Sequence, residues 1–157
     1  MSPSINKNLS LSSMLFLAAL MAVLVACGAA PDEPPAGAAD GPVGLDLAQS
    51  LPPGDRDRGA ALANSRDCLA CHRDLPTGPP FEAGQVAAIG TRAADRIQQP
   101  DYRGQATTAE GYLLESIVNP DVFVVEGYPA GLMPTDFGAR LSQQQAADLI
   151  AYLSSLQ

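Results

Sequence analysis

The sequence has no tryptophan, one histidine and three cysteines among 157 residues, and only 5% of its residues are aromatic. So few aromatic side chains predict a thin hydrophobic core for a domain of about 100 residues, which a bound apolar group would complete. No cysteine follows Cys71 and no histidine follows His72. The chain therefore lacks the second ligand pair of a usual structural zinc site.

Basic residues are also scarce, because 9 Lys plus Arg stand against 17 Asp plus Glu, and the formal net charge is −8. The one lysine is Lys7, so every later basic residue is an arginine. An acidic chain is repelled by phosphate backbones and by anionic lipid headgroups. The composition therefore excludes nucleic acid as a partner, and it excludes membrane binding by charge.

The N-terminus has the pattern of an export signal. Lys7 precedes an apolar run over residues 14–25, and Ala26-Cys27-Gly28 then places small residues around a cysteine. A short positive region, a short apolar core and a small-residue cleavage site are typical of a secretory signal. The end of this segment resembles the lipobox of bacterial lipoproteins, which implies cleavage before Cys27 and attachment of lipid to Cys27.

An uncleaved membrane anchor is the alternative, because the uncharged stretch over 9–30 is about as long as a bilayer-spanning helix requires. In both cases we expect the rest of the chain to lie outside the cytoplasm and to be held at a membrane. The lipobox favours a lipid anchor on the outer face, periplasmic or extracellular, of a bacterial membrane.

Composition divides the chain into three expected parts: a lipoprotein signal peptide over 1–26, a lipidated N-terminus and linker over 27–54, and a domain over 55–157. Residues 28–54 contain 6 Ala, 6 Pro and 5 Gly among 27. A segment of this composition buries too little apolar surface to fold, which predicts a linker.

Helical signals dominate the expected domain. A short helix is predicted from Asp55 to about Cys68, and a capping box predicts a second helix starting at Thr107 and running to about Val118. A capping box at Ser142 predicts a final helix to about residue 154, whose apolar stripe is Ala146, Leu149, Ile150 and Leu153.

The stretches over 73–106 and 122–125 show no clear periodicity and are expected to be mostly loop, the first of them being long enough to require a reason such as a cofactor. The sequence thus predicts an all-α domain of three to four short helices with long loops.

Two cysteines three residues apart and an adjacent histidine form the run Cys68-Leu69-Ala70-Cys71-His72. This spacing attaches a c-type haem: the thiols add to its two vinyl groups, and the histidine becomes an axial ligand of the iron. A thioredoxin-like cysteine pair is expected after a strand in a βαβ unit, which the helical pattern does not provide. A plain disulfide leaves His72 unexplained. The motif therefore predicts one covalently bound haem c with the loops wrapped around it.

Met133 is the expected sixth ligand of the iron. The other methionines lie in the signal, and Met133 lies in the Gly- and Pro-rich stretch over 127–134 between two helices. Ligation by His and Met raises the reduction potential and fills both axial positions. A closed iron site favours electron transfer over catalysis, so we expect an electron carrier rather than an enzyme. A haem-based sensor or peroxidase is the alternative that needs an open site.

The domain over 55–157 resembles a class I monohaem cytochrome c. The resemblance rests on the haem motif, on Thr77-Gly78-Pro79, on Leu132-Met133-Pro134 and on the segment over 148–153. It implies a cytochrome c fold in which the first and last helices cross at Gly59, against residues such as Leu149 and Tyr152.

The resemblance also implies contacts around the haem. The carbonyl of Pro79 is expected to accept the second ring N–H of His72, a usual way to orient a ligand histidine. The tryptophan that usually lies near a haem propionate is absent, so Tyr102, Arg92 and Arg103 are the candidates for that position.

The lipobox, the linker and the stretch over 128–134 together resemble the lipid-anchored monohaem subunit of alternative complex III, a quinol-oxidising assembly, and cytochrome domains attached to terminal oxidases. The implied partners are redox proteins, with a quinol-oxidising complex as donor and an oxidase or soluble carrier as acceptor. We expect a membrane-tethered carrier, and the alternative is a fixed haem subunit of such a complex. A lysine-free surface does not suit a partner adapted to basic cytochromes.

Overall fold

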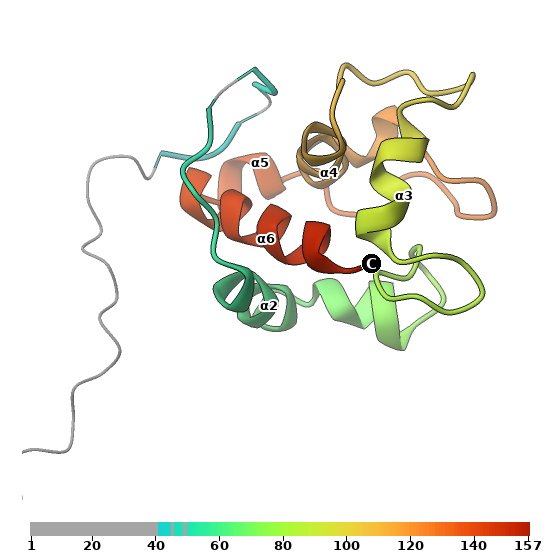
Figure 1. Cartoon of the computed structure of the whole chain (residues 1–157), viewed down its shortest axis with the longest axis horizontal. Helices are drawn as coiled ribbons and strands as arrows, with labels where there is room; N and C mark the ends of the chain where they lie inside the picture. Colours follow the sequence, from blue (N-terminus) through green and yellow to red (C-terminus); the bar gives the residue numbers. More distant parts are fainter. Residues whose placement is uncertain (1–40, 45, 49) are drawn as a thin grey trace, which may run out of the picture. The chain divides into compact units, whose positions relative to one another are not determined.

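The computed structural model describes residues 41–44, 46–48 and 50–157, and within them it contains helices and loops but no strand (Figure 1). The helices in chain order are α2 (Arg56–Ser65), η1 (Ala70–Asp74), α3 (Ile89–Arg96), α4 (Ala109–Val118), η2 (Pro120–Val122), α5 (Phe137–Arg140) and α6 (Gln143–Ser155). The expected all-α architecture is confirmed. No helix in this part of the chain is long and apolar enough to cross a membrane. The expected signal peptide and Cys27 lie outside the described residues.

Helix α2 begins where the sequence predicts it. Asp55 is the N-cap, and its side chain accepts a hydrogen bond from the backbone N–H of Arg58 at 2.8 Å. A carboxylate at this position satisfies a free amide and favours the positive end of the helix. The helix ends when Arg66 closes the last turn on the carbonyl of Leu62. The haem-motif residues therefore follow directly from a well-defined helix end.

Helices α2 and α6 cross at Gly59. A Cβ atom at this position would overlap the backbone carbonyl of Asp148 and would meet Cβ of Tyr152 at 2.8 Å. Only glycine permits this approach, because any other side chain would push the two helices apart. The crossing implied by the resemblance is present, with Asp148 and Tyr152 nearest to the glycine.

The core lies between α6 and the helices α2, α3 and α4. The capping box of α6 is confirmed, since Ser142 accepts from the backbone of Gln145 and the Gln145 side chain accepts in return. The predicted apolar stripe of α6 is buried, and it packs with the apolar side of α4. Buried residues of these two helices include Leu113, Leu114, Ile117, Val118, Ala146, Leu149, Ile150 and Leu153.

Two local predictions are corrected. The N-cap of α4 is Thr108, whose hydroxyl accepts from Gly111 N–H at 3.0 Å, so the predicted start at Thr107 is one residue too early. The expected loop over 73–106 contains the helix α3, which has no side-chain cap and buries Ile89, Arg92 and Ala93. A buried arginine hides the apolar pattern of this helix from a periodicity argument. The stretch over 122–125 is free of strand, as predicted.

Residues that precede the expected start of the domain at residue 55 also contact the domain. Val43 donates its backbone N–H to Leu141 at 2.8 Å, an isolated bridge joins Pro42 to Ser142, and the Val43 side chain is only 2% exposed. We call residues 41–44, 46–48 and 50–54 the strap. Its apolar side chains are few, but its backbone groups find partners on α5 and α6, which composition alone cannot indicate.

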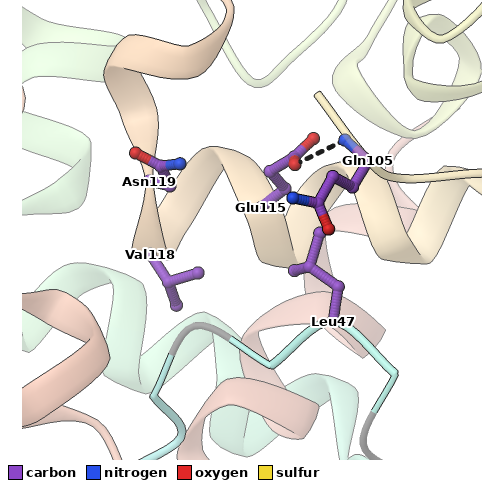
Figure 2. A pocket seen from close by; sticks show the side chains of 5 residues that line it. All are labelled: Leu47, Gln105, Glu115, Val118 and Asn119. Atoms are coloured by element: carbon purple, nitrogen blue, oxygen red, sulfur yellow. Dashed lines mark hydrogen bonds between the residues drawn. The ribbon is translucent and has the colours of Figure 1, made fainter. Parts of the chain in front are cut away.

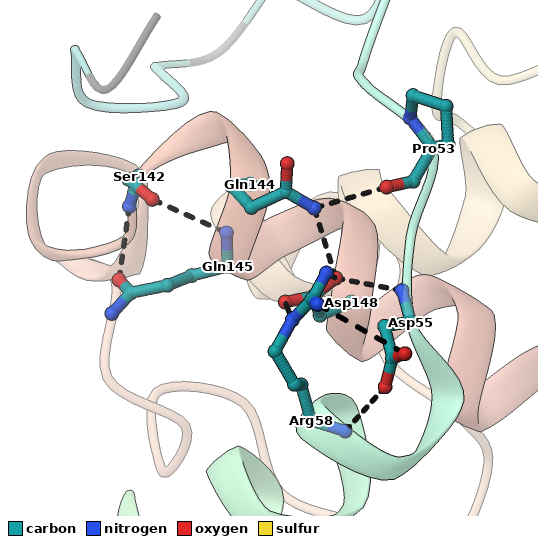
Figure 3. A network of polar contacts seen from close by, with 7 residues as sticks. All are labelled: Pro53, Asp55, Arg58, Ser142, Gln144, Gln145 and Asp148. Atoms are coloured by element: carbon teal, nitrogen blue, oxygen red, sulfur yellow. Dashed lines mark hydrogen bonds and ion pairs between the residues drawn. The ribbon is translucent and has the colours of Figure 1, made fainter. Parts of the chain in front are cut away.

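A polar network joins the start of α2 to α6 (Figure 3). The carboxylate of Asp148, which is buried, accepts from Asp55 N at 2.7 Å and from Arg58 Nε and Nη2 at 2.9 and 3.0 Å. Gln144 Nε2 donates to it at 3.0 Å and also donates to the carbonyl of Pro53. Burial raises the pKa of Asp148, but these hydrogen bonds outweigh it and hold the pKa below its usual value.

Replacing Asp148 with Asn is expected to destabilise the protein by about 1–3 kcal/mol at neutral pH, because hydrogen bonds to a buried charge are lost or weakened. The pKa of the unfolded carboxyl is about 4, and the folded value is lower. The stabilisation is therefore present above about pH 4 and is lost as pH falls through the folded pKa. Denaturant unfolding over a pH series measures both effects. Asp136→Asn, which weakens an exposed pair with Arg140, is the control and should change little. Equal unfolding free energies for wild type and D148N would contradict the role of this network.

Candidate haem site

Two residues, Arg66 and Asp67, separate the end of α2 from the haem motif. Asp67 has a φ of +60°, a left-handed conformation that Asp tolerates better than most residues, and it turns the chain out of the helix. Cys71 and His72 then lie in η1, a single π-helical turn of the kind often found at functional sites. Neither Cys68 nor Cys71 forms a disulfide. Both thiols are therefore available on one short turn.

The two thiols lie in different surroundings. Cys68 is half-buried and packs against the core, whereas Cys71 is exposed. Burial raises the pKa of the Cys68 thiol, so this sulfur is protonated at neutral pH. The arrangement offers one sulfur toward the core and one toward solvent.

The imidazole of His72 is oriented by a backbone carbonyl. Its Nδ1 lies 2.8 Å from the carbonyl oxygen of Pro79, which is the contact that the resemblance implies. A carbonyl only accepts, so Nδ1 carries the proton and Nε2 keeps a free lone pair. Burial lowers the pKa of His72, although the Pro79 carbonyl acts in the opposite direction. The ring is therefore neutral at pH 7 and suited to bind a metal through Nε2.

The loop after η1 folds back over the histidine. Phe81 stacks on His72 with ring centroids 4.3 Å apart and an interplanar angle of 12°. Gly78 donates its N–H to Cys71, and a Cβ atom on Gly78 would lie 3.0 Å from His72 Cε1 and Nδ1. Phe81 was missed from the sequence because nothing in its spacing links it to the motif.

A cavity of about 410 Å³ lies beside the histidine and is lined by His72, Arg73, Asp74, Leu75, Pro76, Gly78, Pro80 and Tyr128. Tyr128 belongs to the loop between η2 and α5, which also contains Met133. Because Tyr128 and His72 line the same cavity, the loop that contains Met133 lies near His72.

Met133 is half-buried and packs against the hydrophobic core. Its loop is shaped by Gly127 and Gly131, with φ of +88° and +74°, which glycine adopts without strain. The N–H of Gly131 donates to the carboxylate of Asp121 at 2.8 Å, which ties the loop to η2. Ligation by Met133 stays a prediction.

Arg92, one of the three propionate candidates, is buried in α3. Its Nη1 and Nη2 donate to the carbonyl oxygens of Ala87 and Pro80. Its Nε is buried and has no hydrogen-bond partner among the described residues. Burial and the nearby Arg96 lower the pKa of Arg92 below its usual value. A buried cation with an unused donor is the kind of group that an anionic ligand stabilises.

Tyr102 and Arg103 have partners within the chain. The hydroxyl of Tyr102 donates to the carboxylate of Glu115 and accepts from Ala106 N–H at 3.1 Å. Burial and Glu115 raise the pKa of Tyr102 to about 12. Arg103 is exposed and donates to the carbonyls of Pro100 and Tyr102. Contacts of Tyr102 and Arg103 with a haem propionate remain predictions. The hydroxyl of Tyr102 already donates its proton to Glu115.

Glu115 is a buried carboxylate that the sequence argument did not single out. It accepts from Gln105 N at 2.8 Å and lines a cavity of about 160 Å³ with Leu47, Gln105, Val118 and Asn119 (Figure 2). A charged residue among the apolar positions of α4 was the available signal. Its hydrogen bonds hold the loop over 102–106 against this helix.

The arrangement of the motif fits a c-type haem. Two free thiols precede a neutral histidine whose Nδ1–H is engaged and whose Nε2 is available. The buried Nε of Arg92 offers a donor to an anionic group. These donors match the thioether, axial-ligand and propionate contacts that such a group requires.

A family model described as Cytochrome c matches residues 57–157 of the chain. This match covers more than half of the sequence, so the chain belongs to the cytochrome c family. No curated protein and no solved structure matches it significantly. Members of this family bind haem c covalently and use it for electron transfer, and the helical domain described above is of that fold.

Gly78→Val is expected to push His72 away from Pro79, because the new side chain begins 3.0 Å from the ring. Overpacking of this kind costs about 1–3 kcal/mol of stability and disturbs the ligand geometry. Thermal unfolding and the visible spectrum of the haem-loaded protein measure the two effects. Gly84→Val is the matched control, since a Cβ there meets nothing within 4 Å. Identical spectra and stabilities for both variants would show that the close approach is unimportant.

Proposed function

We propose that the chain is a single-haem electron carrier in which Cys68 and Cys71 hold the haem and His72 ligates its iron. The observation that carries this proposal is the hydrogen bond from His72 Nδ1–H to Pro79, beside two free thiols. This hydrogen bond orients the neutral ring and leaves the lone pair of Nε2 available to a metal, close to the two cysteines that would attach the haem.

The bound haem would supply a one-electron ferrous–ferric couple. His72 and Met133 would be its axial ligands. Met133 is supported by its half-buried position in the loop whose Tyr128 lies on the same cavity as His72. A residue on each axial position leaves no coordination site for a substrate, which favours a carrier over an enzyme, a sensor or a peroxidase.

The haem-loaded protein is expected to show a c-type α-band in its reduced-minus-oxidised spectrum. Met133→Ala should abolish the weak red band of methionine–ferric iron ligation and should lower the reduction potential, because a thioether ligand favours the ferrous state. Leu132→Ala, at the adjacent and 56% exposed position, is the control and should keep the band. A missing α-band overturns the proposed function, whereas a red band that survives in M133A overturns only the sixth ligand.

Arg92 is the proposed propionate partner. It is supported by the burial of its guanidinium and by its unused Nε, and Arg103 and Tyr102 have weaker support because one is exposed and the other is hydrogen-bonded to Glu115. Pro80 and Ala87 hold the guanidinium in place through their carbonyls. A cation fixed in this way would stabilise the ferrous form over the more positive ferric form.

Arg92→Gln is expected to lower the reduction potential, by roughly 60 mV if the charge contributes a tenfold preference for the ferrous state. Redox titration of the full haem-loaded chain measures the shift. Arg103→Gln makes the same chemical change at an exposed site, where solvent screens the charge, and should shift the potential little. Arg92→Lys keeps the charge and separates an electrostatic effect from lost packing. A larger shift in R103Q than in R92Q would reverse the assignment.

We further propose that the protein is exported and anchored through lipid on Cys27 to the outer face of a bacterial membrane. The support is the signal and lipobox pattern over 1–28. A quinol-oxidising complex as donor and an oxidase or soluble carrier as acceptor fit this location. Membership of an assembly resembling alternative complex III is the second form of the proposal, and sizing after detergent extraction separates the two, because only a subunit co-migrates with a complex.

A further inference from the structure

The strap lies outside the family match, which begins at residue 57, but it is bound to the domain. Gly44 donates its N–H to Gly138 at 2.8 Å, and Gln143 donates to Gly41 at 3.3 Å. Together with the Val43 hydrogen bond and the Pro42 bridge, these contacts fix the first described residues to α5 and to the start of α6. The strap therefore precedes the part of the chain that the family match covers, and it binds to the surface formed by α5 and the start of α6.

Packing continues along the strap toward α2. Leu47 lines the cavity beside Glu115 (Figure 2). Leu51 packs against the core. Near its end, Pro53 accepts from Gln144, and a Cβ on Gly54 would overlap the carbonyl of Ala147. The strap thus contacts the domain at its beginning, middle and end.

The attachment point has a consequence for a tethered domain. Between Cys27 and Asp55 lie 28 residue steps, but only 14 separate Cys27 from Gly41. A chain spans at most about 3.3–3.6 Å per residue, so docking of the strap cuts the greatest possible reach from about 100 Å to about 50 Å. For a flexible coil, halving the number of residues from 28 to 14 lowers the mean end-to-end distance by about 1.4-fold.

The strap also sets which end of the domain is tethered. Gly41 is bonded at the start of α6, while the light-green segment after α2, which contains η1, lies toward the C-terminal end of that helix (Figure 1). The 13 residues of α6 span about 20 Å. The haem motif is thus displaced from the attachment point along the length of α6.

Resting on the lipid anchor proposed above, we propose that the strap makes the domain a short-range carrier, which reaches a membrane-bound donor only where the redox site of that donor lies close to the lipid surface. The docked strap holds the tether at the α5–α6 end and presents the haem motif at the other end. A partner that remained far from the lipid surface would be out of reach.

The test uses the full-length, haem-loaded lipoprotein in phosphatidylcholine vesicles that carry a headgroup dye, which the haem quenches at close range. Val43→Asp places a charge at a 2% exposed position and should release the strap, whereas Val86→Asp makes the same change at a 48% exposed position. A reference variant carries 14 Gly and Ser residues inserted before Gly41 and so reproduces the longer reach. Should V43D fail to fold, Val43→Ala with Val86→Ala replaces the pair.

In the wild type and in V86D, the Gly44 amide should be protected from hydrogen exchange and the dye strongly quenched. V43D should exchange Gly44 at least about tenfold faster and lose quenching to the level of the insertion variant, with its haem spectrum unchanged. An unprotected Gly44 in the wild type, or V43D quenching equal to wild type while the insertion variant differs, overturns the inference. Failure to stay on vesicles overturns the lipid anchor and the reach with it, and a missing α-band overturns the haem function, so the failures are distinguishable.

Discussion

The close approach of α2 and α6 at Gly59 is the contact on which the site depends. Asp148 acts on α2 twice: its backbone carbonyl lies where a Cβ of Gly59 would be, and its carboxylate accepts from Asp55 N and Arg58. One residue of α6 therefore fixes both the start and the middle of α2. Because η1 begins soon after α2 ends, the same contact determines where the cysteines and the histidine lie relative to the core.

At least four of the eight arginines are held by groups within the domain, whereas most carboxylates lie on its exposed surface. Arg58 pairs with buried Asp148, Arg73 and Arg140 pair with carboxylates close to them in sequence, and Arg92 is buried against carbonyls. Cations engaged in this way contribute little attraction to an approaching protein, while most of the carboxylates stay exposed. A partner of this domain is thus expected to present a basic or apolar surface, unlike partners adapted to lysine-rich cytochromes.

Signals between residues close in the sequence predicted much of this structure. Contacts between residues far apart in the sequence could not be predicted from the pattern. The haem motif, the capping box at Ser142 and the apolar stripe of α6 depend on residues a few positions apart, so the pattern alone carries them. Helix α3 was not predicted because its buried face includes Arg92. The contacts of the strap were not predicted because its partners, such as Leu141, are about 100 positions away in the sequence. The hydrogen bond of His72 to Pro79 came from family resemblance, since spacing does not show where a carbonyl points.

Two consecutive carbonyls hold two of the groups that are proposed to contact the haem, the axial ligand His72 and the propionate partner Arg92. Pro79 accepts from His72, and Pro80 accepts from Arg92. Proline fixes φ and has no N–H, so this pair is stiff and offers only acceptors. The next residue, Phe81, stacks on His72, and its carbonyl accepts a hydrogen bond from the backbone N–H of Ile89 at the start of α3. A three-residue segment therefore contacts both the ligand histidine and the helix that carries the buried cation, and it fixes the two groups relative to one another in this structure.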